Sequence, residues 1–342
     1  VEYALPINIA NLKKDLEKYR IFYDIWFPES TIHANGEVAE TIELLRKSDY
    51  TYEKDGALWY KNIEVQTARL QAQGYSQEDI DKLELKDDVL IRANGNPTYF
   101  AADIAYHRNK LEKRGFDKAI DVWGADHHGH VARLKGALDA LDLNGTERLD
   151  IVLMQLVNLL QDGKPVRMSK RSGKAIALHD LLDEISVDAA RYFFNSRSST
   201  TPLDFDLDLA VRQDSENPVY YVQYAHARIC SLIANLAAEG SAVAPAAQID
   251  AALLTDPAEQ ALIKALSLLP DEIHQAAKTY DPSRINRYLV SLAGDFHRFY
   301  NACRIKGEAE EVVAARLKLA DSVRAVLANG LALLGVAAPE KM

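Results

Sequence analysis

The pattern of apolar residues changes at about residue 214, and this change constrains the fold of the 342-residue chain more than any other feature. Before it, short apolar runs alternate with amphipathic stretches, which is typical of an α/β unit. We expect strands over 89–93, 119–123 and 150–153, and helices over 7–25, 100–114, 130–141 and 187–194. After it, helical patterns alone follow, over 216–239, 255–278, 282–304 and 309–334. The sequence therefore predicts an α/β domain over 1–214 and an all-α bundle over 215–342.

The composition narrows the class of protein. With 48% apolar and 26% charged residues, wholesale disorder is excluded, and the formal net charge of −10 argues against a general polyanion binder. The longest apolar runs fall short of the ~20 residues that span a bilayer. Two cysteines, Cys230 and Cys303, provide neither a disulfide framework nor a Cys-rich zinc site. Because residues 1–3 show no secretory signal, we expect a cytoplasmic protein.

Three of the nine histidines fall within the segment Trp123–His130, directly after a predicted strand and before a predicted helix. This is the carboxyl end of a strand, where open α/β sheets bind ligands. Gly124 and Gly129 allow a close backbone approach, and Asp126 can accept hydrogen bonds from a ribose. Two alternatives stay open: solvent-facing histidines, or a metal site like the Asp-His-His string of the manganese-dependent DHH phosphoesterases.

A basic loop follows over 163–174, with five cations in the eleven residues from Lys164 to Lys174. Such a loop can fold over a triphosphate and stabilise the negative charge that develops during phosphoryl or nucleotidyl transfer. It is not a Walker loop, because Gly-x-x-x-x-Gly-Lys-Ser/Thr is absent from it. The alternative is a solvated surface loop.

Tyr99 and Asp103 lie four residues apart, so on a helix both occupy one face. A carboxylate beside a phenol is a fair receptor for a guanidinium, which a carboxylate binds with two parallel hydrogen bonds. The alternative is a packed Tyr99 with Asp103 paired to Arg108 or Lys110.

Aromatic residues open the helical half. Tyr220, Tyr224 and Arg228 share one helical face, which suits stacking and phosphate contact with unpaired nucleotides, although an aromatic stripe also fits a core. A second basic set can form a positive face or pair with acids inside the bundle. It comprises Arg284, Arg287, Arg298, Arg304 and Lys306.

In this order, the motifs resemble those of the arginyl-tRNA synthetases, a family of class I aminoacyl-tRNA synthetases. The segment from Val122 to Val131 is similar to the post-strand motif of that family, and Arg167–Ser172 to its KMSKS loop. The run from Asn217 to Arg228 and the ending from Ala338 to Met342 are similar to the start and end of its helical anticodon-binding domain. The resemblance implies the second half of a Rossmann-like nucleotide-binding domain over 1–214, followed by an α-helical anticodon-binding bundle.

The resemblance also implies roles for individual residues. Arginine would be bound by Tyr99, Asp103 and His127; ATP by Gly124, Asp126, Met168, Ser169 and Lys170; and tRNA by Tyr220, Tyr224 and Arg228. Lys170 would be the catalytic residue, because its charge neutralises the triphosphate in the transition state. No residue is expected to bind a metal ion.

The implied function is that of an arginine–tRNA ligase, which activates arginine with ATP and transfers it to its tRNA. ATP would be a substrate accompanied by Mg²⁺, and no tightly bound cofactor is expected. The expected partners are arginine, ATP and an arginine-accepting tRNA, with no membrane, and the chain is expected to be monomeric.

Three features depart from the family pattern. The string His127–His130 fits the letters of the HIGH signature, but it lies inside the post-strand motif, and no other HIGH candidate occurs. We therefore expect a fragment without the HIGH-containing part and with weak or no activity alone; the alternatives are a truncated paralogue that binds tRNA or a partner without catalysis, and a DHH-type phosphoesterase. The first KMSKS position is Arg167, and residues 66–88 fit a helix-turn-helix insertion or a surface loop equally well.

Overall fold

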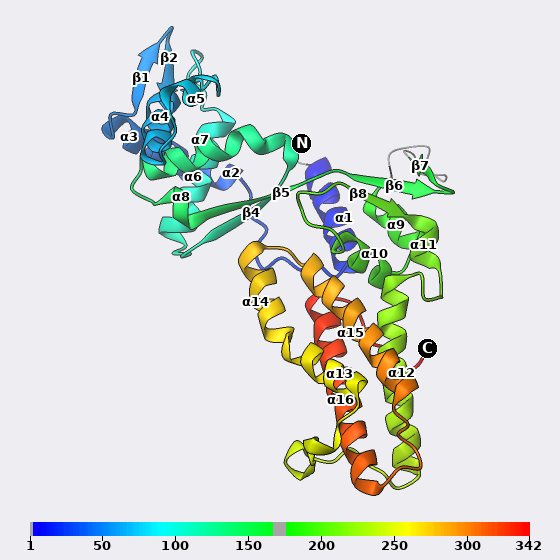
Figure 1. Ribbon diagram of the computed structural model, residues 1–342. Coiled ribbons are helices and arrows are strands. Elements are labelled where there is room, and N and C mark those ends of the chain that lie inside the picture. The colour runs from blue at the N-terminus through cyan, green and yellow to red at the C-terminus, as the bar shows by residue number, and fades with distance from the viewer. Residues whose placement is uncertain (1–2, 167–175) are drawn as a thin grey trace. The chain divides into compact units, whose positions relative to one another are not determined.

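The computed structural model describes residues 3–166 and 176–342. The chain forms two compact units (Figure 1): a central unit, Tyr23–Gln155, and a terminal unit built from Val1–Phe22 and Leu156–Met342. The terminal unit thus contains both α/β elements and the helical bundle. The predicted boundary at residue 214 divides the chain by fold type and stays a prediction.

The central unit contains two small sheets. An antiparallel sheet has the order β1 (Thr51–Lys54), β2 (Ala57–Tyr60), β3 (Asp88–Ile91), and a parallel pair is formed by β4 (Ala119–Gly124) and β5 (Leu149–Met154). The β1–β2 hairpin turns at Asp55-Gly56, where both residues have positive φ. Asp-Gly is favoured in such two-residue turns because their geometry requires left-handed backbone.

Helices surround these sheets in the central unit. They are α2 (Ser30–Ala34), α3 (Glu37–Lys47), α4 (Asn62–Ala72), α5 (Gln77–Asp81), α6 (Tyr99–Arg108), α7 (His128–Asp139) and α8 (Gly145–Arg148). A π-helical turn, Asn109–Lys113, extends α6, and a 3₁₀ turn, Ala125–His127, joins β4 to α7. Phe100 and Ile104 of α6 and Leu134 and Leu138 of α7 are buried in one core, so both helices are anchored by their apolar faces.

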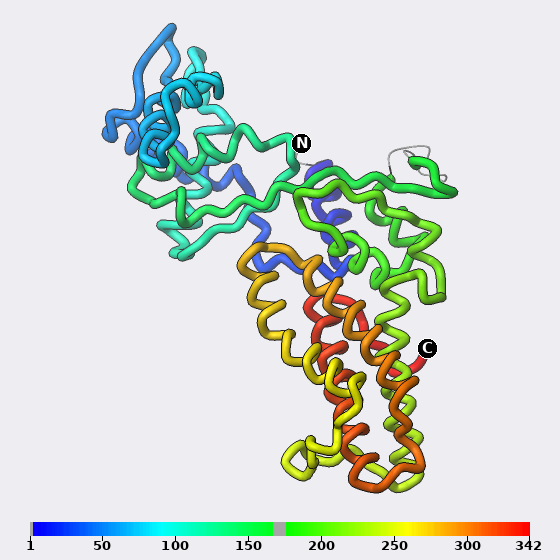
Figure 2. The backbone as a smooth tube through the Cα atoms, in the orientation of Figure 1, coloured from blue at the N-terminus to red at the C-terminus, as the bar shows by residue number. Residues whose placement is uncertain are grey.

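The terminal unit begins with α1 (Ala4–Lys18). Its sheet has the order β7 (Lys164–Val166), β6 (Val157–Gln161), β8 (Leu203–Asp206), with β6 and β8 parallel. Short helices α9 (Leu178–Glu184), α10 (Val187–Phe194) and α11 (Leu207–Val211) accompany it. The bundle comprises α12 (Pro218–Ala238), α13 (Pro257–Ser267), α14 (Leu269–Thr279), α15 (Ser283–Ala302) and α16 (Glu310–Leu333). The last helix, α16, packs against α12, α13 and α15 (Figure 2).

Most predicted elements are confirmed. The three predicted strands are β3, β4 and β5, and the segment 66–88 holds the end of α4 and all of α5, as in the helix-turn-helix alternative. The single helix predicted over 255–278 is wrong: it is divided into α13 and α14 at Leu268, two residues before Pro270. The helix predicted over 7–25 ends early, because Arg20 adopts a φ of 63°, outside the helical region.

Arg191 of α10 connects three distant parts of the terminal unit. Its Nε donates to the backbone oxygen of Leu334 (2.9 Å), and its Nη1 donates to that of Tyr19 (2.8 Å). Gly335 lies directly against the Arg191 guanidinium, because a Cβ at this position would be 2.4 Å from Nε. Gly335 also has a φ of +67°, so both the contact and the backbone conformation favour glycine at this position.

Asp188, one turn before Arg191, connects the same parts through its carboxylate. Its Oδ1 accepts hydrogen bonds from Arg20 Nη1 (2.5 Å) and from the backbone N–H of Ala337 (3.2 Å). Its Oδ2 accepts one from Gln223 Nε2 of α12 (2.9 Å). The segment after α1, the bundle helix α12 and the turn after α16 therefore meet at one helix, α10.

We expect Gly335→Ala to destabilise the protein by about 2–3 kcal/mol, because positive φ alone costs an alanine about 1 kcal/mol and the collision with Arg191 adds to it. Urea unfolding measures the loss. Gly240→Ala is the matched control, because Gly240 also has positive φ (+94°) but open space around its Cβ position. Equal losses in the two variants would show that the contact with Arg191 contributes nothing.

Candidate functional site

The carboxyl end of β4 leads through the 3₁₀ turn Ala125–His127 into α7, so the cluster lies between a strand and a helix, as the sequence predicts. Gly124 is the last residue of β4, and a Cβ there would lie 2.5 Å from Asp126 Oδ1. Glycine at this position leaves room for the Asp126 side chain in the conformation it adopts over the strand end. The side chains of Asp126 and His127 are 82% and 60% exposed, with Oδ2 and Nε2 3.7 Å apart. Both predicted residues are thus available to a ligand.

Asp103 lies one turn into α6, whose first residue is Tyr99. Thr98 caps this helix by accepting a hydrogen bond from the backbone N–H of Ala101. The Asp103 side chain is 42% exposed, and its Oδ2 is 2.9 Å from His130 Nε2. Tyr99 is 79% exposed, so it extends into solvent on the open side of the helix.

Both parts of the alternative interpretation of Tyr99 and Asp103 are wrong. Tyr99 is not packed. Arg108 pairs with Glu112 (2.6 Å) and Glu40 (3.1 Å). Lys110 pairs with Asp121 (2.8 Å), so neither cation neutralises Asp103.

Aromatic contacts extend the Asp103 neighbourhood to the histidine cluster. The Trp123 ring lies 5.5 Å from the His130 ring and 6.1 Å from the His127 ring. The structure therefore brings Asp103, His130, Trp123 and His127 into one continuous group at the end of β4. Sequence reasoning included His130 in the cluster but assigned no contact to it.

A largely buried group of ionisable side chains joins the end of α6 to β4. Sequence reasoning missed this group. His107 places Nδ1 2.7 Å from the backbone oxygen of Asp103 and Nε2 2.6 Å from Asp121 Oδ2. Lys110 Nζ donates to Asp121 Oδ1 at 2.8 Å. Burial alone would raise the pKa of Asp121, but the hydrogen bonds and charges of His107 and Lys110 lower it to about 2. The available signal was a carboxylate inside the otherwise apolar strand 119–123.

Because the pKa of Asp121 is lower in the folded protein, its stabilising effect is present above its ordinary pKa and is lost as pH falls toward 2. We expect the free energy of unfolding to decrease between pH 5 and pH 3, and this decrease to be smaller in Asp121→Asn. Urea midpoints at each pH measure it. Asp126→Asn, which changes an exposed carboxylate, is the control. Parallel pH profiles for wild type and Asp121→Asn would contradict the assignment.

Part of the predicted basic loop lies beyond the described ranges. Arg167, Met168, Ser169 and Lys170 lie outside the described residues. The β6–β7 hairpin leads into this segment, and β7 ends at Val166. The predicted ATP contacts of Met168, Ser169 and Lys170 remain predictions.

The aromatic face of α12 lines one side of an open cavity of about 540 Å³. The rings of Tyr220 and Tyr224 stack with centroids 6.2 Å apart and an angle of 8° between their planes. Arg228 places its guanidinium over the Tyr300 ring at 4.1 Å. None of the three predicted residues is buried, so the core alternative is wrong for them.

His297 of α15 completes this cavity and was also missed. Its ring lies 6.2 Å from that of Tyr224. Burial, and then the charge of Arg228, lower the pKa of His297, which keeps the ring neutral at neutral pH. The sequence offered no sign that 297 faces 224, because the contact depends on how two helices pack.

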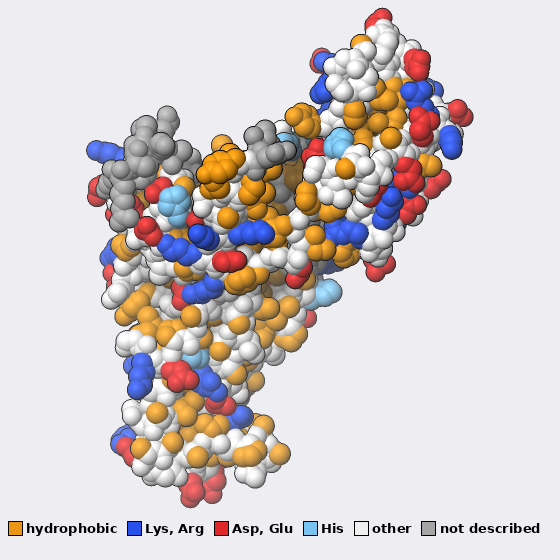
Figure 3. Space-filling model, turned by 180° about the vertical axis from the view of Figure 1, so that it is seen from behind, with side chains coloured by type: hydrophobic (Ala, Val, Ile, Leu, Met, Phe, Trp, Pro, Cys, Tyr) orange, Lys and Arg blue, Asp and Glu red, His pale blue; other side chains and the backbone are white. Residues whose placement is uncertain are grey.

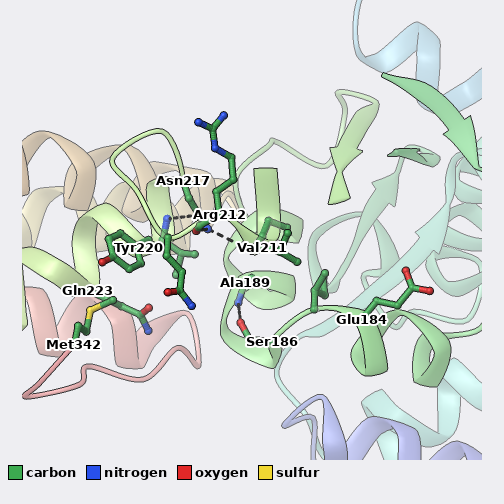
Figure 4. A pocket seen from close by; sticks show the side chains of 13 residues that line it. Glu184, Ser186, Ala189, Val211, Arg212, Asn217, Tyr220, Gln223 and Met342 are labelled. Atoms are coloured by element: carbon green, nitrogen blue, oxygen red, sulfur yellow. Dashed lines mark hydrogen bonds between the residues drawn. The ribbon is translucent and has the colours of Figure 1, made fainter. Parts of the chain in front are cut away.

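A second cavity, of about 530 Å³, lies where α10, α11 and the start of α12 meet (Figure 4). Tyr220 lines it as well as the first cavity, and Met342 reaches it from the end of the chain. Asn217 caps α12 here, accepting from the backbone N–H of Val219 and donating to the backbone oxygen of Arg212. The cap fixes where the aromatic face of α12 begins.

The second basic set pairs with neighbours, as its alternative interpretation predicts. Ion pairs join Arg284 to Glu272, Arg287 to Asp281, Arg298 to Asp295 and Lys306 to Glu239, and Arg304 donates to the backbone oxygen of Lys306. On the face of the molecule shown in Figure 3, side chains of Lys and Arg are interspersed with those of Asp and Glu. A continuous positive face on α15 is therefore not formed by these residues.

Residues 3–166 and 176–342 contain neither a cluster of metal ligands nor a membrane-spanning helix. Among these residues, no group of three or more His, Cys, Asp or Glu side chains is arranged to hold a metal ion. No helix in the same ranges is long and apolar enough to cross a bilayer.

The chain is similar to known proteins over its whole length. The model of the DALR anticodon binding domain matches residues 222–342. Arginine–tRNA ligases of Ruminiclostridium cellulolyticum and Acetivibrio thermocellus are 54% and 52% identical to the whole chain. The chain spans 57% of the length of each.

A solved structure decides the family. The putative arginyl-tRNA synthetase of Campylobacter jejuni is 32% identical, with a TM-score of 0.81, and the match covers 100% of this chain and 69% of that one. The chain belongs to the arginyl-tRNA synthetase family. Family membership replaces the DHH phosphoesterase alternative.

More distant structures show the fold alone. Thermus thermophilus arginyl-tRNA synthetase matches 96% of this chain and 62% of its own, with 23% identity and a TM-score of 0.79. Methionyl-tRNA synthetase of Mycobacterium tuberculosis, at 13% identity, has a TM-score of 0.66 and covers 94% of this chain and 76% of that one. The predicted class I fold with an α-helical anticodon-binding domain is confirmed.

Proposed function

We propose that this chain is part of an arginine–tRNA ligase. The reaction proposed is ATP-dependent activation of arginine, followed by its transfer to an arginine-accepting tRNA. The observation that carries the proposal is the half-exposed carboxylate of Asp103, held by His130 and free of a cationic partner among the described residues. A guanidinium is the ligand such a carboxylate binds best, because the two planar groups form parallel charge-assisted hydrogen bonds. Tyr99 and His127 supply a phenol and an imidazole on the exposed side.

ATP is proposed to bind at the end of β4, near Gly124 and Asp126, and to meet Met168, Ser169 and Lys170 of the basic loop. The carboxylate of arginine is itself the nucleophile toward the α-phosphorus, so the protein contributes positioning and electrostatic stabilisation. Lys170 would neutralise charge on the phosphates. Mg²⁺ is expected to arrive with ATP, because the described residues provide no ligand cluster for a resident ion.

For tRNA, we propose that Tyr220, Tyr224 and Arg228 contact unpaired nucleotides, with His297 as a fourth member. The match to the DALR anticodon binding domain and the aromatic cavity support this. A base can stack on an exposed ring, and the guanidinium of Arg228 adds charge for a phosphate. The proposal also includes a monomeric, cytoplasmic protein without a membrane partner.

We expect Asp103→Asn to weaken arginine binding at least tenfold and to leave ATP binding unchanged, because a hydrogen bond to a charged group contributes about 1.5–3 kcal/mol. Isothermal titration calorimetry of the chain with each ligand measures both. Asp126→Asn is the crossed control, expected to weaken ATP binding and spare arginine. Equal effects of Asp103→Asn on both ligands would make Asp103 a structural residue instead.

Tyr224→Ala is expected to weaken binding of an arginine-accepting tRNA about tenfold, because stacking of one base on an aromatic ring contributes about 1–3 kcal/mol. Fluorescence anisotropy with labelled tRNA measures the affinity. Tyr75→Ala, which removes an exposed tyrosine from the central unit, is the matched control. Unchanged affinity in Tyr224→Ala would contradict a role for this face in tRNA binding.

A further inference from the structure

Four side chains of the central unit form a continuous series of hydrogen bonds that ends on Asp103. The series, called here the Asp103 relay, comprises Asp88, Arg133, His130 and Asp103. Asp88 Oδ1 accepts from Arg133 Nη1 (2.5 Å), Arg133 Nε contacts His130 Nδ1 (2.7 Å), and His130 Nε2 contacts Asp103 Oδ2 (2.9 Å). The residues come from β3, α7 and α6, which are distant in sequence.

The relay fixes the tautomer of His130. Arginine nitrogens always carry hydrogen, so Arg133 Nε donates and His130 Nδ1 must accept with its lone pair. The ring proton then lies on Nε2 and is donated to Asp103 Oδ2. His130 is therefore a neutral donor placed between a guanidinium and a carboxylate.

Packing immobilises the inner part of the relay and leaves its end open. The His130 ring lies 5.6 Å from the Phe100 ring in an edge-on arrangement, and Arg133 lies over the same Phe100 ring at 5.2 Å. The side chains of His130 and Asp88 are 12% and 16% exposed, whereas that of Asp103 is 42% exposed. The carboxylate thus meets solvent from a rigid base.

We propose that His130 is the positioning residue for Asp103, and that Arg133 and Asp88 act through it. The Nε2–H of His130 occupies one lone pair of Oδ2 and fixes the side-chain conformation of Asp103. Oδ1 and the second lone pair of Oδ2 remain for the two parallel hydrogen bonds of the substrate guanidinium. Its neutral ring also keeps Arg133, itself a guanidinium, from pairing with the carboxylate that binds substrate. This inference rests on the proposed role of Asp103 in binding arginine.

Two variants of His130 distinguish the effect of its hydrogen-bond donor from the effect of the space that its ring fills. His130→Phe keeps an aromatic ring between Phe100 and Trp123 but removes the donor, so we expect arginine binding to weaken about tenfold, with ATP binding unchanged. His130→Gln places an amide N–H near the position of Nε2, and it is expected to recover most of this loss. His33→Phe, which removes an exposed histidine of the same unit, is the control.

A double-mutant cycle distinguishes positioning from a general structural effect. In an Asp103→Asn background, His130→Phe should have little further effect on arginine affinity, because the residue acts through Asp103. Additive losses would overturn the proposal. If Asp103→Asn weakens arginine binding while His130→Phe does not, the relay alone fails. If Asp103→Asn itself has no effect, the proposed function fails.

The tautomer provides a readout that needs neither substrate nor activity. In ¹⁵N-labelled protein, long-range ¹⁵N–¹H correlation should show the His130 ring neutral, with hydrogen on Nε2 and none on Nδ1. Asp103→Asn should shift the Nε2 resonance of His130, and His33→Phe should not. A hydrogen on Nδ1 would overturn the relay.

Discussion

A buried carboxylate at the middle of β4 determines the geometry of the candidate site. Asp121 remains ionised because His107 of α6 and Lys110 of the π-helical turn that extends it bind its two oxygens. Leaving this charge without either cation would cost several kcal/mol, so α6 cannot move away from β4 without a large penalty. His107 also contacts the backbone oxygen of Asp103. The ion group thus sets the height of Asp103 relative to the strand end where α7 begins.

In the terminal unit, too, directional polar contacts hold separate elements together. Here they are hydrogen bonds to the ends of helices. Arg191 binds backbone oxygens that follow α1 and α16, where helices end and leave carbonyls without helical partners. Asp188 accepts hydrogen bonds from the Gln223 side chain of α12 and from the backbone N–H of Ala337, which follows α16. Apolar packing alone would allow helices to slide, whereas these directional contacts fix the ends of several elements against α10.

Local chemistry explains what could be predicted from the sequence. Apolar alternation identified β3 to β5 and the bundle helices, and the motif order identified the family through Gly124, Asp126 and the tyrosines of α12. The β1–β2 hairpin was missed, although Asp55-Gly56 is a turn signal, because each strand has only four residues and β1 is polar. The His130–Asp103 contact and the Tyr224–His297 contact could not be predicted, since they depend on how separate helices pack. Met168, Ser169 and Lys170, which are predicted to contact ATP, lie outside the described part of the chain.

The place of Asp88 has an evolutionary consequence. It is the first residue of β3, and its register partner in β2 is Tyr60, a fully buried core residue. A core substitution at Tyr60 therefore acts on the backbone that carries Asp88, which begins the Asp103 relay. With the proposed role of Asp103 in binding arginine, selection can adjust the affinity through hydrophobic residues that do not contact the ligand, while the contacting residues stay the same.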